Sequence, residues 1–377
     1  MTQAPDAQTI ASPDQEMWLV PHTAVTRSLT EPTGFRIAWG EGPARDEITD
    51  LSPALAEWLL SLNSPVTPRR MAHTLQTALR IPSAEASALV AGLINRGLFA
   101  SQPHSLSEGH RIWSAIGWHD AAALHSATRD TALRYEPLDA PTDDLPSVTD
   151  HTSVHAVALP PVSRSLDQAD FFTAFKDRRT HRNFQNTTLT VQQLADLLHW
   201  TFRPAVPNGP AAAEDSASRP VTPFSAQRPG ADLPAEPLTA FVLLDPKTGP
   251  AELLKVDWRF RYSARHHTLE PAGNGPKIES ISELLWDQDF SVGAPAFIIF
   301  CVNWREYMAR HRSSYGYRLS QLDLGSFMQT ALVAASALHL RTFLTPALDD
   351  ERFAQILGTE DSEQAPCYML AIGGRES

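Results

Sequence analysis

Hydrophobic positions divide the chain into a front part of short helices and a larger rear part. Leucines recur at helical spacing in three runs in the front part, and Gly97 ends the third. A short apolar run follows at 98–100, and 35–39 alternates like a half-buried strand. Three short helices followed by a strand are typical of a winged-helix domain. In an acidic chain, such a domain is expected either to dock proteins or peptides or only to support the larger domain.

The rear part alternates strands with helices, which predicts an α+β or α/β arrangement. Strands are expected at 238–244, 258–262, 295–302 and 367–372, and one long helix with many small residues at 319–340. In the second strand, Arg259 and Arg261 fall on the face opposite the aromatic side chains. The segment 208–237 is rich in Pro, Ala and Ser and predicts a lid or a disordered loop. We therefore predict a winged-helix-like domain at 1–102, a helical connector with a Pro-rich linker at 103–167, and the main domain at 168–377.

Charge and cysteine content narrow the classes of partner. Among 377 residues, 31 Lys and Arg oppose 43 Asp and Glu, a net charge of −12, which argues against a nucleic-acid or anionic membrane partner. Cys301 and Cys367 lie far apart without a CxxC motif, as expected for core residues in a reduced compartment. The chain starts without a signal-peptide pattern, and its longest apolar run is too short to cross a bilayer. These features predict a soluble cytoplasmic protein.

The histidines give no indication of a metal site. They do not cluster at the spacing of metal ligands. His266 and His267 are adjacent, so their rings are expected on opposite faces of a strand.

The densest group of chemically versatile side chains lies between Arg178 and Arg182, which hold three arginines, a threonine and a histidine. A capped helix is expected to begin directly after 188–190, so this segment is predicted to be a turn between helices. Guanidinium groups present forked donors that suit a phosphate or an electron-rich ring. The simpler interpretation is surface charge in front of a helix.

Several stretches, in this order, are similar to those of one family. The stretch 178–184 is similar to RRSxRxF, 258–271 to GLYRYDPxxHxLEP, and 317–329 to YR…LxxGxxxQ. The stretch 118–130 is similar to FHxATR, 348–358 to FDD…LLG, and 371–373 to AVG. Over about the last two thirds, the chain thus resembles the nitroreductase-like flavoproteins. More narrowly, it resembles the SagB-type dehydrogenases, FMN-dependent oxidases that convert peptide azolines to azoles.

The resemblance implies an α+β nitroreductase-like FMN fold, with an antiparallel-rich central sheet wrapped by helices, and a homodimer. It implies that Arg178, Thr180 and Arg182, with Arg179 alongside, hold the FMN phosphate and the edge of the ring at N1 and O2, where reduction places negative charge. The turn at Thr345 and Pro346 would face the N5 side. The remaining cofactor-binding residues implied by the resemblance are Ser225, Gln329 and Arg375.

Two departures from the family bear on catalysis. The SagB-type dehydrogenases carry a Lys-Tyr pair thought to take a proton from the substrate, and this chain lacks it. Depending on the alignment, His311 or Tyr315 is the candidate for handling that proton. His311 also fits an ordinary exposed histidine in a basic run. The family's GLG turn after the long helix has become 339–341, His-Leu-Arg, which is expected either to crowd the flavin edge or to pack it against a partner.

The resemblance implies oxidation of thiazoline or oxazoline rings in a ribosomally made, modified peptide. Hydride would pass to flavin N5, and O2 would reoxidise the flavin. A cyclodehydratase is then a candidate partner. Two alternatives stay open: an NAD(P)H-dependent nitro or quinone reductase, and a non-catalytic scaffold subunit of a cyclodehydratase–dehydrogenase complex.

Overall fold

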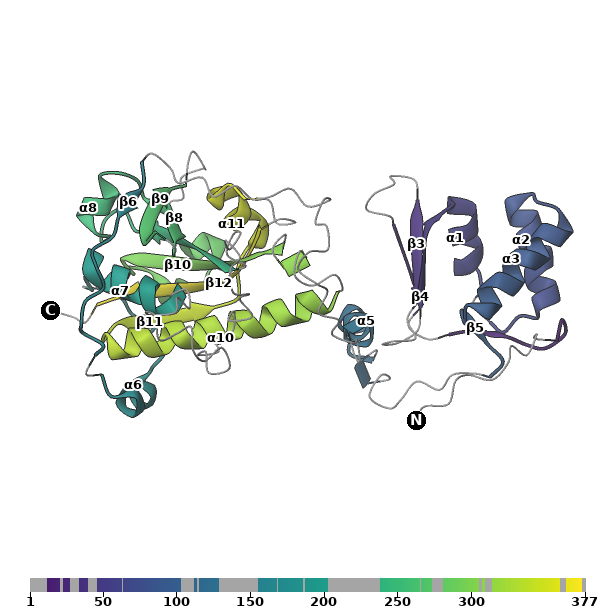
Figure 1. The fold of residues 1–377 in the computed structure, drawn as a ribbon, viewed down its shortest axis with the longest axis horizontal. Coiled ribbons are helices and arrows are strands. Elements are labelled where there is room, and N and C mark those ends of the chain that lie inside the picture. The colour runs from purple at the N-terminus through teal and green to yellow at the C-terminus, as the bar shows by residue number, and fades with distance from the viewer. Residues whose placement is uncertain are drawn as a thin grey trace, which may run out of the picture. The chain divides into compact units, whose positions relative to one another are not determined.

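A computed structural model describes most of the chain in two compact units, Met1–Leu138 and Asp139–Ser377 (Figure 1). The described residues are 12–20, 23–27, 34–39, 46–62, 64–102, 112–113, 115–128, 155–167, 169–185, 187–202, 238–264, 266–272, 281–304, 307–308, 314–359 and 364–374. The predicted loop 208–237 and the candidate residues Ser225, His311 and Arg375 lie outside them.

The N-terminal unit contains the three predicted helices and the strand that follows them. Its elements are β1 (Trp18–Leu19), β2 (Ala24–Arg27), β3 (Phe35–Trp39), β4 (Asp46–Leu51), α1 (Pro53–Leu60), α2 (Pro68–Leu79), α3 (Ser83–Asn95), β5 (Phe99–Ala100) and α5 (His119–Thr128). Thr67 caps α2 by accepting from the backbone N–H of Arg70, and Gly97 ends α3 with φ +78°. Strands β2, β3 and β4 form one antiparallel sheet, and β1 pairs with β5. The winged-helix assignment of this unit stays a prediction.

The second unit is built on a seven-stranded sheet. Its elements are β6 (Val157–Ala158), α6 (Phe171–Asp177), α7 (Val191–Phe202), β7 (Leu238–Leu244), α8 (Ala251–Leu254), β8 (Arg259–Ser263), β9 (Thr268–Pro271), η3 (Ile281–Leu284), η4 (Asp289–Ser291), β10 (Ala296–Asn303), α10 (Tyr315–Ala337), β11 (Arg341–Thr345), α11 (Asp350–Leu357) and β12 (Gln364–Gly373). The strand order is β11-β12-β10-β7-β8-β9-β6, and every pair is antiparallel. The predicted antiparallel-rich central sheet is therefore confirmed.

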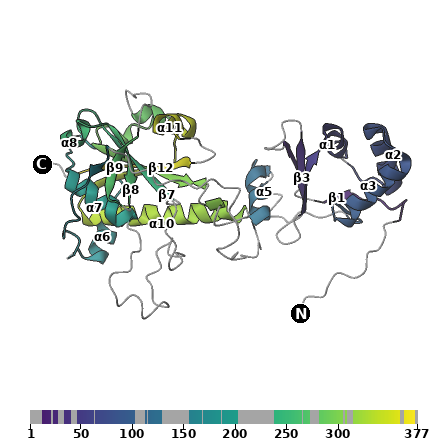
Figure 2. The ribbon, with the colours of Figure 1, turned by 45° about the horizontal axis from the view of Figure 1, so that its top comes forward.

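Helices cover both faces of this sheet (Figure 1). Alternate residues of each strand point to opposite faces. One set packs with α7 and α10 in the larger core, and the other set packs with α11 and η3. The tilted view also shows α6 beside α10, where the Ser336 hydroxyl donates to the Ala174 carbonyl at 2.6 Å (Figure 2). Cys301 is fully buried in the second core, the one that packs with α11 and η3, so its prediction as a core residue is confirmed.

Two sequence expectations need correction. His266 and His267 lie in the turn between β8 and β9, not in a strand, because His267 adopts a left-handed φ of +52° and reverses the chain. The long helix spans Tyr315–Ala337 and ends before 338–340, where left-handed His339 turns the chain into β11. The predicted strand alternation holds for Phe260 and Tyr262, which pack in the larger core, but Trp258 precedes β8 and packs with the second core. Arg259 is only 1% exposed.

No helix in the described ranges combines the length and the hydropathy that a bilayer span requires. Among the residues whose structure is described, no group of three or more His, Cys, Asp or Glu side chains is placed to hold a metal ion.

Candidate functional site

The arginine segment connects α6 to α7, as predicted, and runs beside β11, the edge strand of the sheet. The His181 backbone N–H donates to the Thr342 carbonyl at 2.7 Å. The Thr342 N–H donates to His181 Nδ1 at 3.0 Å, so this nitrogen carries no proton. Arg341 of β11 donates to the Asn183 carbonyl at 2.8 Å. These bonds fix an otherwise irregular segment against the sheet.

The segment is also anchored where it enters α7. Thr190 and Gln193 form a capping box, because each backbone N–H donates to the other's side chain, at 3.0 and 3.1 Å. The predicted capped start of this helix is thus confirmed. Just before it, the Thr188 carbonyl accepts from the Gly374 N–H at 2.6 Å. A Cβ at Gly374 would lie 2.3 Å from that oxygen, so only glycine permits this approach.

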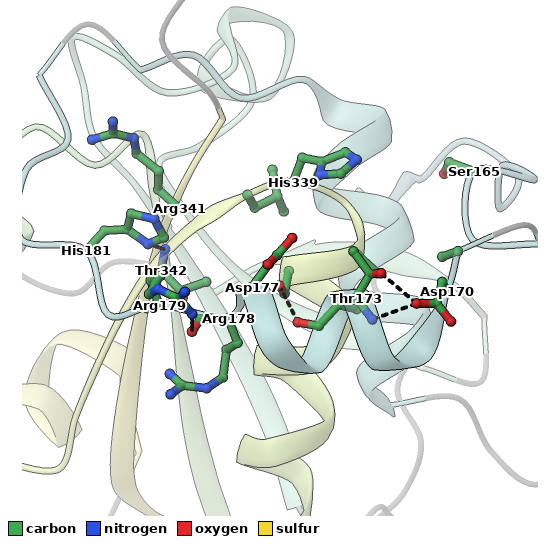
Figure 3. A pocket seen from close by; sticks show the side chains of 15 residues that line it. Ser165, Asp170, Thr173, Asp177, Arg178, Arg179, His181, His339, Arg341 and Thr342 are labelled. Carbon is green, nitrogen blue, oxygen red and sulfur yellow. Dashed lines mark hydrogen bonds between the residues drawn. The ribbon is translucent and has the colours of Figure 1, made fainter.

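A cavity of about 660 Å³ opens between α6 and the turn that follows α10 (Figure 3). It is lined by Ser165, Ala169, Asp170, Thr173, Ala174, Asp177, Arg178, Arg179, His181, Ser336, Ala337, His339, Leu340, Arg341 and Thr342. Asp170 caps α6 and accepts from the Thr173 N–H at 2.7 Å. Its hydrogen bonds, first from the Thr173 side chain, lower the pKa of Asp170 and keep it ionised. The cavity therefore has an acidic wall on α6 and a basic end at the arginine segment.

Two of the predicted phosphate ligands lie at this cavity. Arg179 donates to the carbonyls of Lys176 and Arg178 at 2.6 and 2.9 Å, which closes the end of α6. The half-buried Arg178 side chain makes no hydrogen bond or ion pair with any described residue. In Figure 3 the guanidinium groups of Arg178 and Arg341 point in different directions. The arginines therefore share a cavity wall without converging on one point.

Arg182 and Thr345 both contact the region around η4, which forms a second candidate place. The Arg182 guanidinium lies over the Phe290 ring, 5.4 Å from its centroid. Phe290 packs on Phe343 of β11, with ring centroids 5.5 Å apart. The Thr345 hydroxyl donates to Gln288 Oε1 at 3.3 Å. The predicted contacts for the ring edge and for the N5 side are thus linked through η4.

The other candidates are dispersed. Thr180 and Pro346 are exposed beside these two places, and Gln329 is exposed on α10. Tyr315 begins α10, whereas Ser336 at the cavity lies near its end, about 30 Å away along the axis at the usual rise per residue. Within one chain, Tyr315 does not reach the cavity.

His181 is the titratable group most affected by this arrangement. Burial lowers its pKa, and the nearby Arg341 and Arg179 guanidinium groups lower it further. The imidazole is therefore neutral near neutral pH and accepts a hydrogen bond from β11.

The sequence did not single out Phe290 and Gln288, because no motif or periodicity marks them. The sequence did identify 339–341 as a departure from the family's GLG turn, and these three residues line the cavity.

The donor set fits FMN. Arg178 offers forked donors to a phosphate, and Arg182 offers them to the electron-rich edge of a ring. The backbone near Thr345 borders the second place. A bound FMN would supply the acceptor for a hydride.

Comparisons with known sequences and solved structures found several proteins to which this chain is similar. The chain is 25% identical over 346 residues to the trifolitoxin operon protein TfxC of Rhizobium leguminosarum bv. trifolii, covering 87% of this chain and 91% of that protein. Among solved structures, a putative nitroreductase of Ralstonia eutropha JMP134 is 19% identical, with TM-score 0.40, over 65% of this chain and 100% of that one. A chain of the E. coli microcin synthetase McbBCD complex with truncated pro-MccB17 bound is 17% identical, with TM-score 0.40, over 73% of this chain and 99% of that one. The nitroreductase family matches residues 175–374, more than half of the sequence, so the predicted nitroreductase-like fold is confirmed and the chain belongs to the nitroreductase family.

Proposed function

We propose that this protein is an FMN-dependent oxidase that dehydrogenates azoline rings, thiazolines or oxazolines, in a ribosomally made peptide. Family membership supports an oxidoreductase, and the similarity to a trifolitoxin operon protein over most of both chains supports a role in peptide maturation. One observation carries the flavin assignment. The half-buried Arg178 lines a cavity and has no hydrogen-bond or ion-pair partner among the described residues.

Each predicted ligand has a defined task in this proposal. Arg178, with Thr180 and Arg179, binds the phosphate, and Arg375 completes the phosphate site. Arg182 binds the edge of the ring, where negative charge develops on reduction. The Thr345–Pro346 backbone lies toward N5. His181 stays neutral and holds the arginine segment on β11, so it orients these ligands instead of adding another charge.

If Tyr315 takes the proton from the substrate, it has to come from a second copy of the chain. Tyr315 lies at the end of α10 remote from the cavity, and α10 presents an exposed stripe that includes Leu322, Gly325 and Ser326. Two α10 helices packed antiparallel along this stripe would bring Tyr315 of one copy toward the cavity of the other. We therefore propose a homodimer in which Tyr315 or His311 handles this proton. A cyclodehydratase that makes the azoline is a natural partner.

Flavin content is the first test. The absorbance spectrum and mass analysis of the released chromophore should show FMN near one per chain. Arg178→Ala removes charge-assisted hydrogen bonds of about 1.5–3 kcal/mol, so we expect FMN affinity to fall about ten- to hundredfold. Arg70→Ala, an exposed arginine on α2, is the matched control. A protein that cannot be loaded with FMN, or an Arg178→Ala variant with unchanged affinity, would contradict the assignment.

The substrate class is tested with the loaded enzyme under anaerobic conditions. An azoline-containing peptide should bleach the flavin absorbance, and admitting O2 should restore it. Bleaching by NAD(P)H, with none by the peptide, would favour the nitro or quinone reductase alternative. A loaded protein that responds to neither would favour the scaffold alternative.

A further inference from the structure

The segment 284–293 contacts both predicted flavin-binding elements. At its centre, Phe290 lies beneath the Arg182 guanidinium and against Phe343 of β11, at 5.4 and 5.5 Å. Gln288 accepts from the Thr345 hydroxyl at 3.3 Å. Chain segments that are far apart in the sequence therefore meet on one ring.

This segment is fixed at both ends, so the ring does not depend on its own burial for its position. The Trp286 indole donates to the Leu348 carbonyl at 2.9 Å, and the Asp349 N–H donates to the Leu284 carbonyl at 2.9 Å. At the other end Gly293 adopts φ +86°, a backbone conformation that favours glycine, and the next residue, Ala294, is fully buried. The Phe290 ring is consequently held in place although it is 44% exposed.

The contact leaves the hydrogen-bonding capacity of Arg182 unused. A guanidinium that lies over a ring is attracted through the ring's electron-rich face, and its five N–H donors stay in the guanidinium plane. Arg182 is exposed and makes no hydrogen bond or ion pair with any described residue. An unsupported arginine side chain has about 2 kcal/mol of rotamer entropy to lose on binding a ligand. A ring that restricts the side chain beforehand reduces that loss.

We propose that Phe290 is a positioning residue that holds the Arg182 guanidinium with its N–H donors directed at the edge of bound flavin where negative charge develops on reduction. This inference rests on the proposed FMN-dependent function and adds a residue to it. Donors that are already oriented stabilise developing charge without reorganising. Phe290 therefore favours reduced over oxidised FMN and raises the flavin's reduction potential.

The test compares Phe290→Leu, which keeps apolar bulk without an aromatic face, with Phe290→Tyr, which restores the face. An exposed cation–π contact contributes about 0.5–1 kcal/mol, so Phe290→Leu should weaken binding of reduced relative to oxidised FMN about two- to fivefold. For a two-electron couple, this change lowers the potential by about 10–20 mV. Phe290→Tyr should match the parent protein. Phe172→Leu on α6, a ring that is 79% exposed, is the matched control and should leave the potential unchanged.

The outcomes separate this inference from the proposed function. If Arg182→Ala lowers the potential and Phe290→Leu does not, the positioning role is overturned and the flavin assignment stands. If neither variant changes the potential while Arg178→Ala still weakens FMN binding, Arg182 is not at the ring edge. The inference then falls together with that role of Arg182, and the phosphate assignment of Arg178 stands. A loss of potential in Phe290→Leu that Phe290→Tyr does not restore overturns the cation–π explanation. A parent protein that cannot bind FMN overturns both proposals.

Discussion

The two faces of the seven-stranded sheet are built differently. One face lies under α7 and α10, two long helices that contribute mainly leucines and alanines to the larger core. The other lies under the short α11 and the irregular segment 281–294, and it carries the contact between Arg182 and Phe290. Regular helices fill a core efficiently, whereas short and irregular elements can direct individual side chains to one point. We infer that the first face mainly supports stability and contributes the end of α10 to the cavity, whereas the second face holds the contacts around η4.

Arg259 shows this difference most clearly. Its side chain is almost fully buried on the α11 side of β8 and donates to the Ile356 carbonyl in the last turn of that helix. Burial lowers the pKa of Arg259, but an arginine in a protein remains charged. A cation at a helix C-terminus is favourable, since the carbonyl ends carry partial negative charge. On the second face a polar contact thus joins β8 to α11, whereas the first face is held to its helices by apolar packing.

The largest expected effect comes from the first face. Leu198→Ala removes a fully buried α7 side chain, so we expect a loss of about 2–5 kcal/mol in the free energy of unfolding. Urea titration of the apoprotein measures it. FMN affinity of the folded fraction should stay within about twofold, because Leu198 neither lines the cavity nor takes part in the contacts around η4. A large change in FMN affinity at unchanged stability would contradict the division of roles between the faces.

An intermediate effect is expected from Arg259→Met. Methionine keeps the volume but leaves the Ile356 carbonyl without this donor, which should cost about 1–3 kcal/mol of unfolding free energy. Faster hydrogen exchange confined to α11 would show that the effect is local. Lys255→Met, at an exposed position in the same unit, is the control and should change little. A stability of Arg259→Met equal to that of the control would show that the contact contributes nothing.

The smallest effect concerns pH and His181. Its pKa is lower folded than unfolded, so at mildly acidic pH the unfolded chain binds more protons. The stability that depends on neutral His181 is therefore fully present above its ordinary pKa of about 6.5 and is lost as the pH falls through the lowered folded value. His181→Asn can still accept from Thr342 and does not titrate. Unfolding free energies measured from about pH 5 to 8 should slope less in this variant, and equal slopes would rule out His181 as the source.

The sequence predicted the sheet and most helices well, because their signals are local. The strand at 296–303 is apolar up to Val302, and the arginine segment was correctly expected between two helices. The start of α7 follows from the Thr190–Gln193 pair, which is a local pattern. For the candidate site, local pattern and family resemblance selected Arg178 and Arg182.

The arrangement of the site could not be predicted in the same way. The contact of Phe290 with Arg182 joins distant segments through a 3₁₀ turn, and neither a 3.6- nor a 2-residue period marks such a ring. The His266–His267 pair has the pattern of a strand, but left-handed His267 makes it a turn. The separation of Tyr315 from the cavity depends on the length and direction of α10, which are properties of the whole fold.

The close approach of Gly374 to Thr188 limits how this protein can diverge. No side chain fits at Gly374, and a Cβ at Gly373 would lie 2.6 Å from the Thr187 hydroxyl. A lineage that replaced Gly374 would have to move the Thr188 backbone just before α7, and one that replaced Gly373 would have to rearrange the Thr187 and Phe184 side chains. Acceptable change at these positions must therefore be concerted, so the last strand and the arginine segment are bound to evolve together.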